Sequence, residues 1–245
     1  MTMESQSIIA EKLRPILKPL YNELFSSVEH INGEKDTFAV QWGSHYPLLN
    51  NNGIIFVGRA TNQWRTVEDG IDALFGDPHD PSTFFNCHDQ MTWVYANEHG
   101  KGYSTNRSAF WRVIRAVARS FYPEDELNHV AWSNVCKIQK HSGKNPEGRI
   151  FDCQIDTCKK IFKAEMDILS PKYVTMFVGN YGKRDILSYM NGGKMPETIC
   201  EKKWDRYKAE VYRINNIVYI CTEHPMRKPE DEHIRCLISL INEFE

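Results

Sequence analysis

The residues best suited to chemistry in this 245-residue sequence follow four short apolar runs, at 53–57, 130–135, 173–178 and 217–221. They include a histidine, amide side chains, a hydroxyl and several glycines. Gly58, Arg59, Ala60, Thr61 and Asn62 follow the first run, Asn134 through Lys137 lie at the end of the second, Gly179–Gly182 follow the third, and Glu223, His224, Pro225 and Met226 follow the fourth. Such groups form directional hydrogen bonds with a small polar ligand. Their types alone predict a small-molecule or nucleobase site.

The apolar runs must be positioned by a sheet if these residues are to meet. Continuous apolar runs of this length favour central parallel strands that are covered on both faces. Apolar residues also recur at helical spacing, which predicts helices that cover the sheet, over 5–28, 111–121, 158–169 and 234–241. The pattern predicts an α/β fold, a three-layer α/β/α sandwich around a mainly parallel four-stranded sheet with right-handed crossovers. In such sheets the ligand lies outside the carboxyl ends of the strands.

The length of the chain favours a single domain over 1–245, with 1–45 as an N-terminal helical extension packed on it. A weaker strand is expected at 38–42. Residues 207–221 predict a hairpin in which Asn215-Asn216 supplies the positive-φ positions of the turn. Residues 63–106 lose the pattern and predict a long, partly ordered excursion, a kind of segment that is usually functional or disordered.

Composition places the chain among ordinary globular proteins: 41% hydrophobic and 25% charged residues, with a net charge of −2. The longest apolar runs are far shorter than the ~20 residues of a membrane helix, and the first residues do not resemble a secretory signal. Seven cysteines, an odd number at wide spacing, favour a reducing cytoplasm. Cys153 with Cys158, and Cys87 with His88, are better explained by packing than by metal binding, so no cofactor is expected.

Two clusters of basic residues stand out against the near-neutral total. They are Lys137, Lys140, Lys144 and Arg149, and Lys202, Lys203, Arg206 and Lys208. A solvated surface explains either cluster. A rim that contacts phosphates requires both clusters to lie beside the same cleft.

The order of the four strand ends resembles the uracil-DNA glycosylase superfamily. The segments that carry the resemblance are IIFVGRATN, VAWSNVCKI, SPKYVTMFVGNYG and VYICTEHPMRK, together with STNRSAFWRVIRAV before the second of them. Each motif is short, but their order and spacing match over about residues 50–240. The resemblance implies a uracil-DNA glycosylase-like fold. It also implies a protein that extrudes a target base and recognises its Watson–Crick edge in a pocket.

Residue roles follow from the resemblance. His224 matches the histidine that stabilises charge on the departing base, and Asn134 matches the asparagine that hydrogen-bonds the base edge. Trp64 can stack on a base. Each has a plainer alternative: a turn without chemical role for His224, an amide that satisfies loop backbone for Asn134, and an ordinary packed side chain for Trp64.

The sequence departs from the family pattern at two motifs. Ala60 stands where several family branches have an Asp or Asn that positions water, which leaves Asn62 or Thr61 to orient it, and Arg59 to face a phosphate or cap the loop. The usual Pro and Gly of this loop are absent at Thr61 and Asn62. Met226 replaces the Ser that follows His-Pro; a methionine can wedge a base step apart, and Arg227 and Lys228 can contact phosphate.

The leading functional hypothesis is a DNA-repair hydrolase: a base-flipping glycosylase that acts on uracil or another damaged base. We expect it to be a cytoplasmic monomer whose partner is DNA with a damaged base or a nucleotide, and to have no membrane association. Two alternatives stay open. One is a noncatalytic nucleic-acid or nucleotide-binding member of the same fold, and the other is a small-molecule hydrolase acting on nucleosides.

Overall fold

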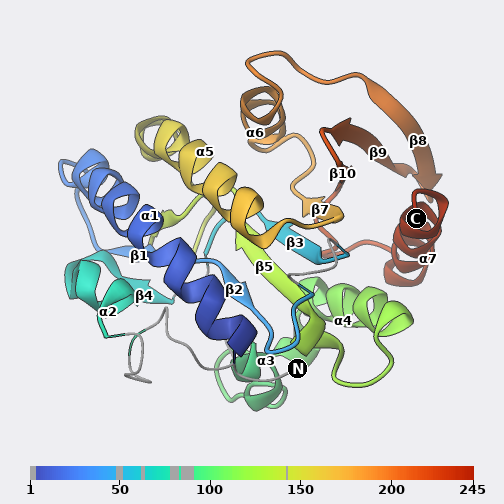
Figure 1. The fold of residues 1–245 in the computed structure, drawn as a ribbon, viewed down its shortest axis with the longest axis horizontal. Coiled ribbons are helices and arrows are strands. Elements are labelled where there is room, and N and C mark those ends of the chain that lie inside the picture. Colours follow the sequence, from blue (N-terminus) through green and yellow to red (C-terminus); the bar gives the residue numbers. More distant parts are fainter. Residues whose placement is uncertain (1–3, 48–51, 62–63, 78–82, 84–90, 142) are drawn as a thin grey trace.

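The computed structural model of the protein describes residues 4–47, 52–61, 64–77, 83, 91–141 and 143–245. In this part of the chain the larger sheet has seven strands, in the order β2-β5-β3-β7-β10-β9-β8 (Figure 1). Their bounds, in that order, are Gln41–Trp42, Val130–Asn134, Ile54–Gly58, Tyr173–Phe177, Ile217–Thr222, Tyr207–Ile214 and Thr198–Trp204.

The four apolar runs form β5, β3, β7 and β10, which lie side by side and parallel at the centre of the sheet. The prediction of an α/β fold is therefore confirmed. The prediction of four strands is wrong, because β2, β9 and β8 extend the sheet with antiparallel pairs. β2 has only two residues, and most residues of β8 are at least partly exposed, so neither strand has a continuous apolar run.

The parallel strands end level with one another. Gly58 pairs with Asn134 in the register of β3 and β5. Thr222, the last residue of β10, pairs with Phe177, the last residue of β7. The residues that follow these strands consequently emerge at one edge of the sheet, where a ligand site of this architecture is expected.

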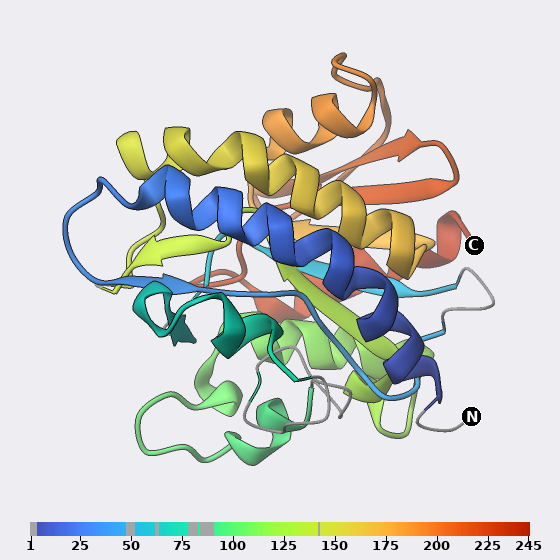
Figure 2. The same ribbon diagram turned by 60° about the vertical axis from the view of Figure 1, so that its left-hand side comes forward.

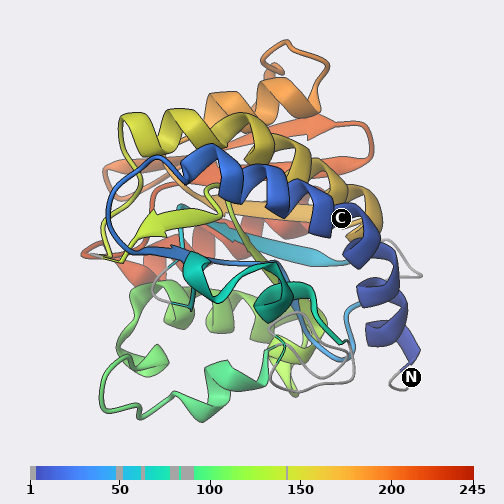
Figure 3. The same cartoon turned by 90° about the vertical axis from the view of Figure 1, so that its left-hand side faces the viewer.

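Helices cover both faces of the sheet, as Figures 2 and 3 show. α1 (Glu4–Val28), α5 (Arg149–Leu169) and α6 (Lys183–Met190) pack on one face, while α4 (Ala109–Phe121) and α7 (Glu230–Glu243) pack on the other. Alternate residues of the strands enter the two cores: Ile55 and Val57 of β3 face α1 and α5, and Phe56 faces α4. The helix predicted at 5–28 is confirmed, and it contains Pro15 and Pro19.

The sequences of α4 and α7 explain how the first packs on the sheet and where the second begins. α4 buries an apolar stripe at helical spacing against the sheet: Phe110, Trp111, Val113, Ile114, Val117 and Ala118. α7 follows Pro229 and carries three acidic residues in its first turn, where negative charge is favourable to the helix dipole.

A smaller antiparallel sheet joins β1 (Lys35–Thr37) to β4 (Arg65–Thr66) and β6 (Ile138–Lys140). The strand predicted at 38–42 is only partly present, as β2. Within 63–106, where a partly ordered excursion was predicted, the described residues include β4 and two short helices, α2 (Ile71–Phe75) and α3 (Thr92–Ala96).

The predicted hairpin is present as β9 and β10, with Ile214 paired to Ile217 across the turn. Asn215 takes a φ of 53°, whereas Asn216 is not among the positive-φ residues of the described chain. The turn thus needs one left-handed residue, and an asparagine tolerates that conformation better than most residues.

The basic cluster around β5 is divided between core and surface. Lys137 is fully buried, and its Nζ lies 2.7 Å from Oε1 of Glu165 and 2.7 Å from Oγ of Ser133. The expectation that Lys137 belongs to a phosphate-contacting rim is therefore wrong: a buried ammonium group needs a close carboxylate, and α5 supplies it. Lys140, Lys144 and Arg149 are exposed.

Candidate functional site

A cavity of about 870 Å³ opens at the carboxyl ends of β3, β5 and β10. It is lined by Gly58, Arg59, Ala60, Thr61, Trp64, Trp93, Asn97, Gly102, Tyr103, Ser108, Phe110, Trp111, Trp132, Asn134, Gly143, Asn145, His224, Met226 and Lys228. Nine of the residues predicted from the sequence, Lys228 included, are among them. Asn62, the other residue expected to act in catalysis, lies outside the described residues.

Gly58 and Asn134 form the floor of the cavity, at the paired ends of β3 and β5. A Cβ on Gly58 would lie 2.4 Å from Oδ1 of Asn134, so the missing side chain makes room for the amide. Asn134 is only 1% exposed, and its Nδ2 has no hydrogen-bond partner among the described residues. A buried amide without a partner is costly, which is consistent with a site whose ligand completes the hydrogen bonding.

His224 follows β10 and is held from two sides. Its ring stacks on Phe110 of α4, with centroids 5.7 Å apart and planes 10° apart. Nδ1 accepts a hydrogen bond from the backbone N–H of Met226 over 3.2 Å. Burial, with further contributions from the positive charges of Arg59 and Lys228, lowers the pKa of His224 to about 4. The imidazole is therefore neutral at pH 7, with its proton on Nε2 as a hydrogen-bond donor.

The turn after His224 decides which side chains reach the cavity. The N–H of Lys228 donates to the carbonyl of Pro225 over 3.1 Å, and Arg227 takes a φ of 60°. This is the arrangement of a type II turn, whose third position usually holds glycine. Met226 and Lys228 line the cavity, whereas Arg227 is exposed and is not one of the lining residues. The prediction that Arg227 binds the substrate is not supported by its position.

Aromatic side chains form one wall of the cavity. The Trp64 ring lies 4.5 Å from the Trp93 ring at 86°, and Trp132 lies 4.9 Å from Trp111 at 80°. Trp64 thus lines the cavity and also packs in an aromatic cluster, so the two readings of this residue are compatible. The sequence interpretation missed Trp93, Phe110, Trp111 and Trp132. Trp132 could have been found, since it lies two residues before Asn134 on the same face of β5.

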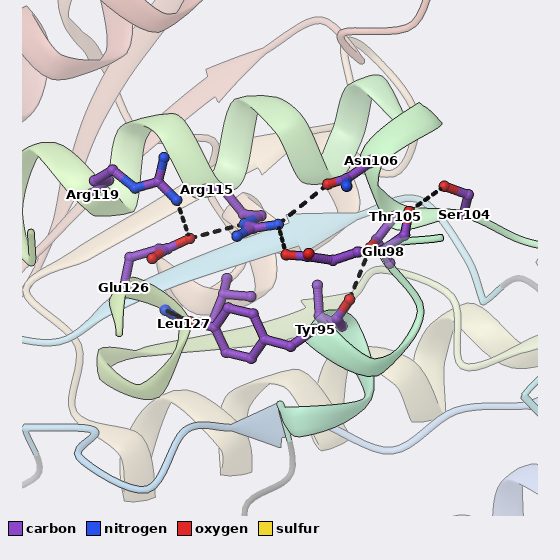
Figure 4. Close-up of polar contacts among 10 residues, drawn as sticks. Tyr95, Glu98, Ser104, Thr105, Asn106, Arg115, Arg119, Glu126 and Leu127 are labelled. Carbon is purple, nitrogen blue, oxygen red and sulfur yellow. Dashed lines mark hydrogen bonds and ion pairs between the residues drawn. The ribbon is translucent and has the colours of Figure 1, made fainter. Parts of the chain in front are cut away.

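A network of ion pairs centred on Arg115 fixes the segment that carries Trp93, Asn97 and Tyr103 (Figure 4). Arg115 of α4 contacts Glu98 through Nη1, and its Nε lies 2.9 Å from Oε1 of Glu126. Arg115 and Glu126 at the centre of this network are largely buried, with exposed fractions of 17% and 5%.

Backbone contacts reinforce the same wall. Oγ1 of Thr105 donates to the carbonyl of Val94 over 2.8 Å, and Oγ of Ser104 donates to the carbonyl of Glu98 over 2.6 Å. These two hydrogen bonds attach Ser104 and Thr105 to α3 and to the residue that follows it closely, Glu98. Contacts within the protein thereby hold this wall of the cavity in place.

The first loop offers limited means of activating water. Ala60 lines the cavity with a methyl group, and Thr61 is 3% exposed with an Oγ1 that has no partner in the described part of the chain. Thr61 is the described residue of this loop that can orient a water molecule. The described lining residues include neither Asp nor Glu.

The described residues contain no group of three or more His, Cys, Asp or Glu side chains placed to hold a metal ion. The six cysteines within the described ranges are unpaired thiols. No helix in these ranges is both long and apolar enough to cross a membrane. No protein-family model matches the chain, and no curated protein has significant sequence similarity to it.

Proposed function

We propose that the cavity holds a nucleobase and that the protein hydrolyses the N-glycosidic bond of uracil, or of another damaged base, flipped out of DNA. The fold is then a uracil-DNA glycosylase-like variant with additional antiparallel strands. The observation that carries the proposal is the convergence of His224 and Asn134 on one cavity, with the imidazole neutral and its proton on Nε2.

The chemistry requires the bond between C1′ of the sugar and the base nitrogen to break, leaving positive charge on the sugar and negative charge on the base. A donor held near a base carbonyl stabilises that negative charge, and one such donor contributes about 3–4 kcal/mol. Nε2–H of His224 is suited to this role because a neutral imidazole donates without losing its proton. Water then adds to C1′, and its proton neutralises the released base.

Asn134 supports recognition of the base before the reaction. A carboxamide offers a donor and an acceptor side by side, which match an adjacent carbonyl and N–H on a base such as uracil. The aromatic wall offers faces for stacking, which contributes roughly 1–3 kcal/mol per base. We assign the orientation of the attacking water to Thr61, whose Oγ1 has no partner in the described part of the chain.

A second candidate is a noncatalytic binder of nucleic acid or nucleotide. Ala60 and the absence of Asp and Glu among the described lining residues favour it, since both remove means of activating water.

Single-turnover incubation separates the two functions. Excess protein is mixed with oligonucleotides that carry uracil, hypoxanthine, xanthine or a mismatched base, in single and double strands, and abasic sites are scored. Abasic sites from at least one modified substrate support the glycosylase. Binding of the same oligonucleotides without abasic sites supports the binder and contradicts the hydrolase.

A further inference from the structure

Two cations line the cavity, and the described lining residues include no carboxylate; Glu223, outside the lining, forms a long ion pair with one of them, Arg59. Arg59 comes from the loop after β3, and Lys228 comes from the turn after β10. The two side chains approach the site from different strands of the sheet. Positive charge at the wall of a partly buried cavity is unfavourable unless an anion compensates it.

Arg59 has hydrogen-bonding capacity that the described part of the chain does not use. Its Nη2 lies 3.9 Å from Oε2 of Glu223, beyond hydrogen-bonding distance, and its buried Nε has no partner in the described chain. Arg112 on α4 shows the contrast, because its Nε lies 2.8 Å from Oε2 of Glu230. The guanidinium of Arg59 is therefore available for a planar, bidentate anion contact.

Lys228 is the second cation, and its neighbour is an aromatic ring. Within the described chain its Nζ lies 5.1 Å from the centroid of the Tyr207 ring. Lys208, on the neighbouring strand β9, is instead paired with both Glu201 and Glu210, at 2.8 and 2.9 Å. The described carboxylates of this region thus pair with Lys208, and none in the described chain forms an ion pair with Lys228.

Both cations act on His224. Arg59, Lys228 and His224 line the same cavity, and the two positive charges contribute, after burial, to the lowered pKa of His224. An anion bound by Arg59 and Lys228 would therefore also lie near His224. The cavity, at about 870 Å³, is large enough for a base together with its sugar and phosphate.

We propose that Arg59 and Lys228 form a phosphate subsite of the cavity, so that the ligand is a nucleotide whose phosphate lies beside the base held at Asn134 and His224. This inference rests on the proposed nucleobase site and adds the class of ligand: a phosphorylated nucleotide is preferred to a nucleoside or a free base. The phosphate can belong to a free mononucleotide or to a DNA strand.

Equilibrium binding tests the subsite without any cleavage. Quenching of tryptophan fluorescence is titrated at low salt with dUMP and with deoxyuridine, and in a second arm with a uracil trinucleotide carrying either phosphodiester or neutral methylphosphonate linkages. We expect the charged member of at least one pair to bind about tenfold more tightly, the size of one charge-assisted hydrogen bond. The pair that shows the preference identifies the source of the phosphate.

Variants assign the preference to the two cations. Arg59→Gln and Lys228→Gln should each reduce it severalfold while leaving affinity for the neutral member within about twofold. Arg112→Gln is the matched control, since it removes a paired arginine outside the cavity. In the wild type, the charged ligand should also raise the NMR-measured pKa of His224, because the anion offsets the two cations.

Equal affinity for charged and neutral ligands in both arms, or a preference that survives both variants, contradicts the phosphate subsite. This result is distinguishable from failure of the proposed function. Cleavage without charge preference would retain the glycosylase and reject the subsite, whereas charge-dependent binding without cleavage would retain the subsite and reject the hydrolase.

Discussion

The backbone N–H of Met226 donates a hydrogen bond to Nδ1 of His224 over 3.2 Å. A backbone N–H can only donate, so Nδ1 must be unprotonated and the proton of the neutral ring must lie on Nε2. The turn that follows β10 thereby sets the tautomer of the histidine as well as its position. The proposed chemistry depends on this relationship.

Replacement of Met226 by proline removes the donor while respecting the turn, because proline is favoured at the second position of a type II turn. Met226→Pro should give a mixture of His224 tautomers, whereas Met226→Ala, which keeps the N–H, should retain protonation on Nε2. Long-range ¹H–¹⁵N correlation spectra of the imidazole distinguish the two states. A single Nε2-protonated form in Met226→Pro would show that the turn does not select the tautomer.

Acid should destabilise the fold through its buried histidines. The pKa of His224 is lowered to about 4 and that of His233 to about 3, mainly by burial, so the unfolded chain binds more protons than the folded one below about pH 6.5. The free energy of unfolding is therefore expected to fall as pH decreases from about 6.5 towards 4, by up to about 1.4 kcal/mol per pH unit for each proton of difference.

His233→Phe tests this pH dependence, since the phenyl ring can keep the stack on Trp204, whose centroid lies 3.9 Å from that of His233. Urea unfolding from pH 7 to pH 5 should show a shallower loss of stability in the variant. Parallel curves for the two proteins would mean that His233 does not contribute.

Gly58→Ala should disturb base recognition. The new Cβ would lie 2.4 Å from Oδ1 of Asn134, so the amide must move. We expect weaker discrimination between uracil and other bases and a stability loss of about 1–3 kcal/mol. Gly102→Ala is a matched control, because Gly102 also lines the cavity but a Cβ there meets nothing within 4 Å. Similar discrimination profiles for both variants would argue against a recognition role for Asn134.

Arg115→Gln should loosen the wall that carries Trp93 and Tyr103. It removes the contacts to Glu98 and Glu126 and leaves Glu126, at 5% exposure, with Arg119 as its remaining ion-pair partner in the described chain. We expect a loss of about 2 kcal/mol on urea unfolding and a changed tryptophan emission in the folded state. Arg119→Gln, on a side chain 56% exposed, should cost less than about 0.5 kcal/mol. Equal effects would mean that Arg115 has no special role in the wall.

Much of the frame could be predicted from the sequence because it depends on local patterns. A continuous apolar run such as 53–57 identifies a strand buried on both faces, and the residues that follow such runs must meet at one edge of the sheet. The pattern therefore predicts that Gly58, Asn134 and His224 lie together, and all three line the cavity. The antiparallel strands β2, β8 and β9 lack such runs, which explains the error in strand number.

What could not be predicted depends on partners distant in the sequence. Lys137 is basic and lies in a basic cluster, but its burial follows from Glu165 on α5, 28 residues away. Trp93 and Tyr103 reach the cavity because Arg115 ties their segment to α4, and no periodicity reveals that contact. Lys228 reaches the cavity, and Arg227 does not, because of a turn whose left-handed residue is an arginine.

The role of His224 is tested most directly by the single-turnover rate of base release from the best oligonucleotide substrate, in wild type and in His224→Ala. His45→Ala, an exposed histidine beside the start of β5, serves as the control. We expect His224→Ala to lower the rate by ~10²-fold or more with affinity for the oligonucleotide nearly unchanged, because the donor acts on charge that develops only as the bond breaks. A rate in His224→Ala equal to that of wild type and His45→Ala would contradict the proposed mechanism.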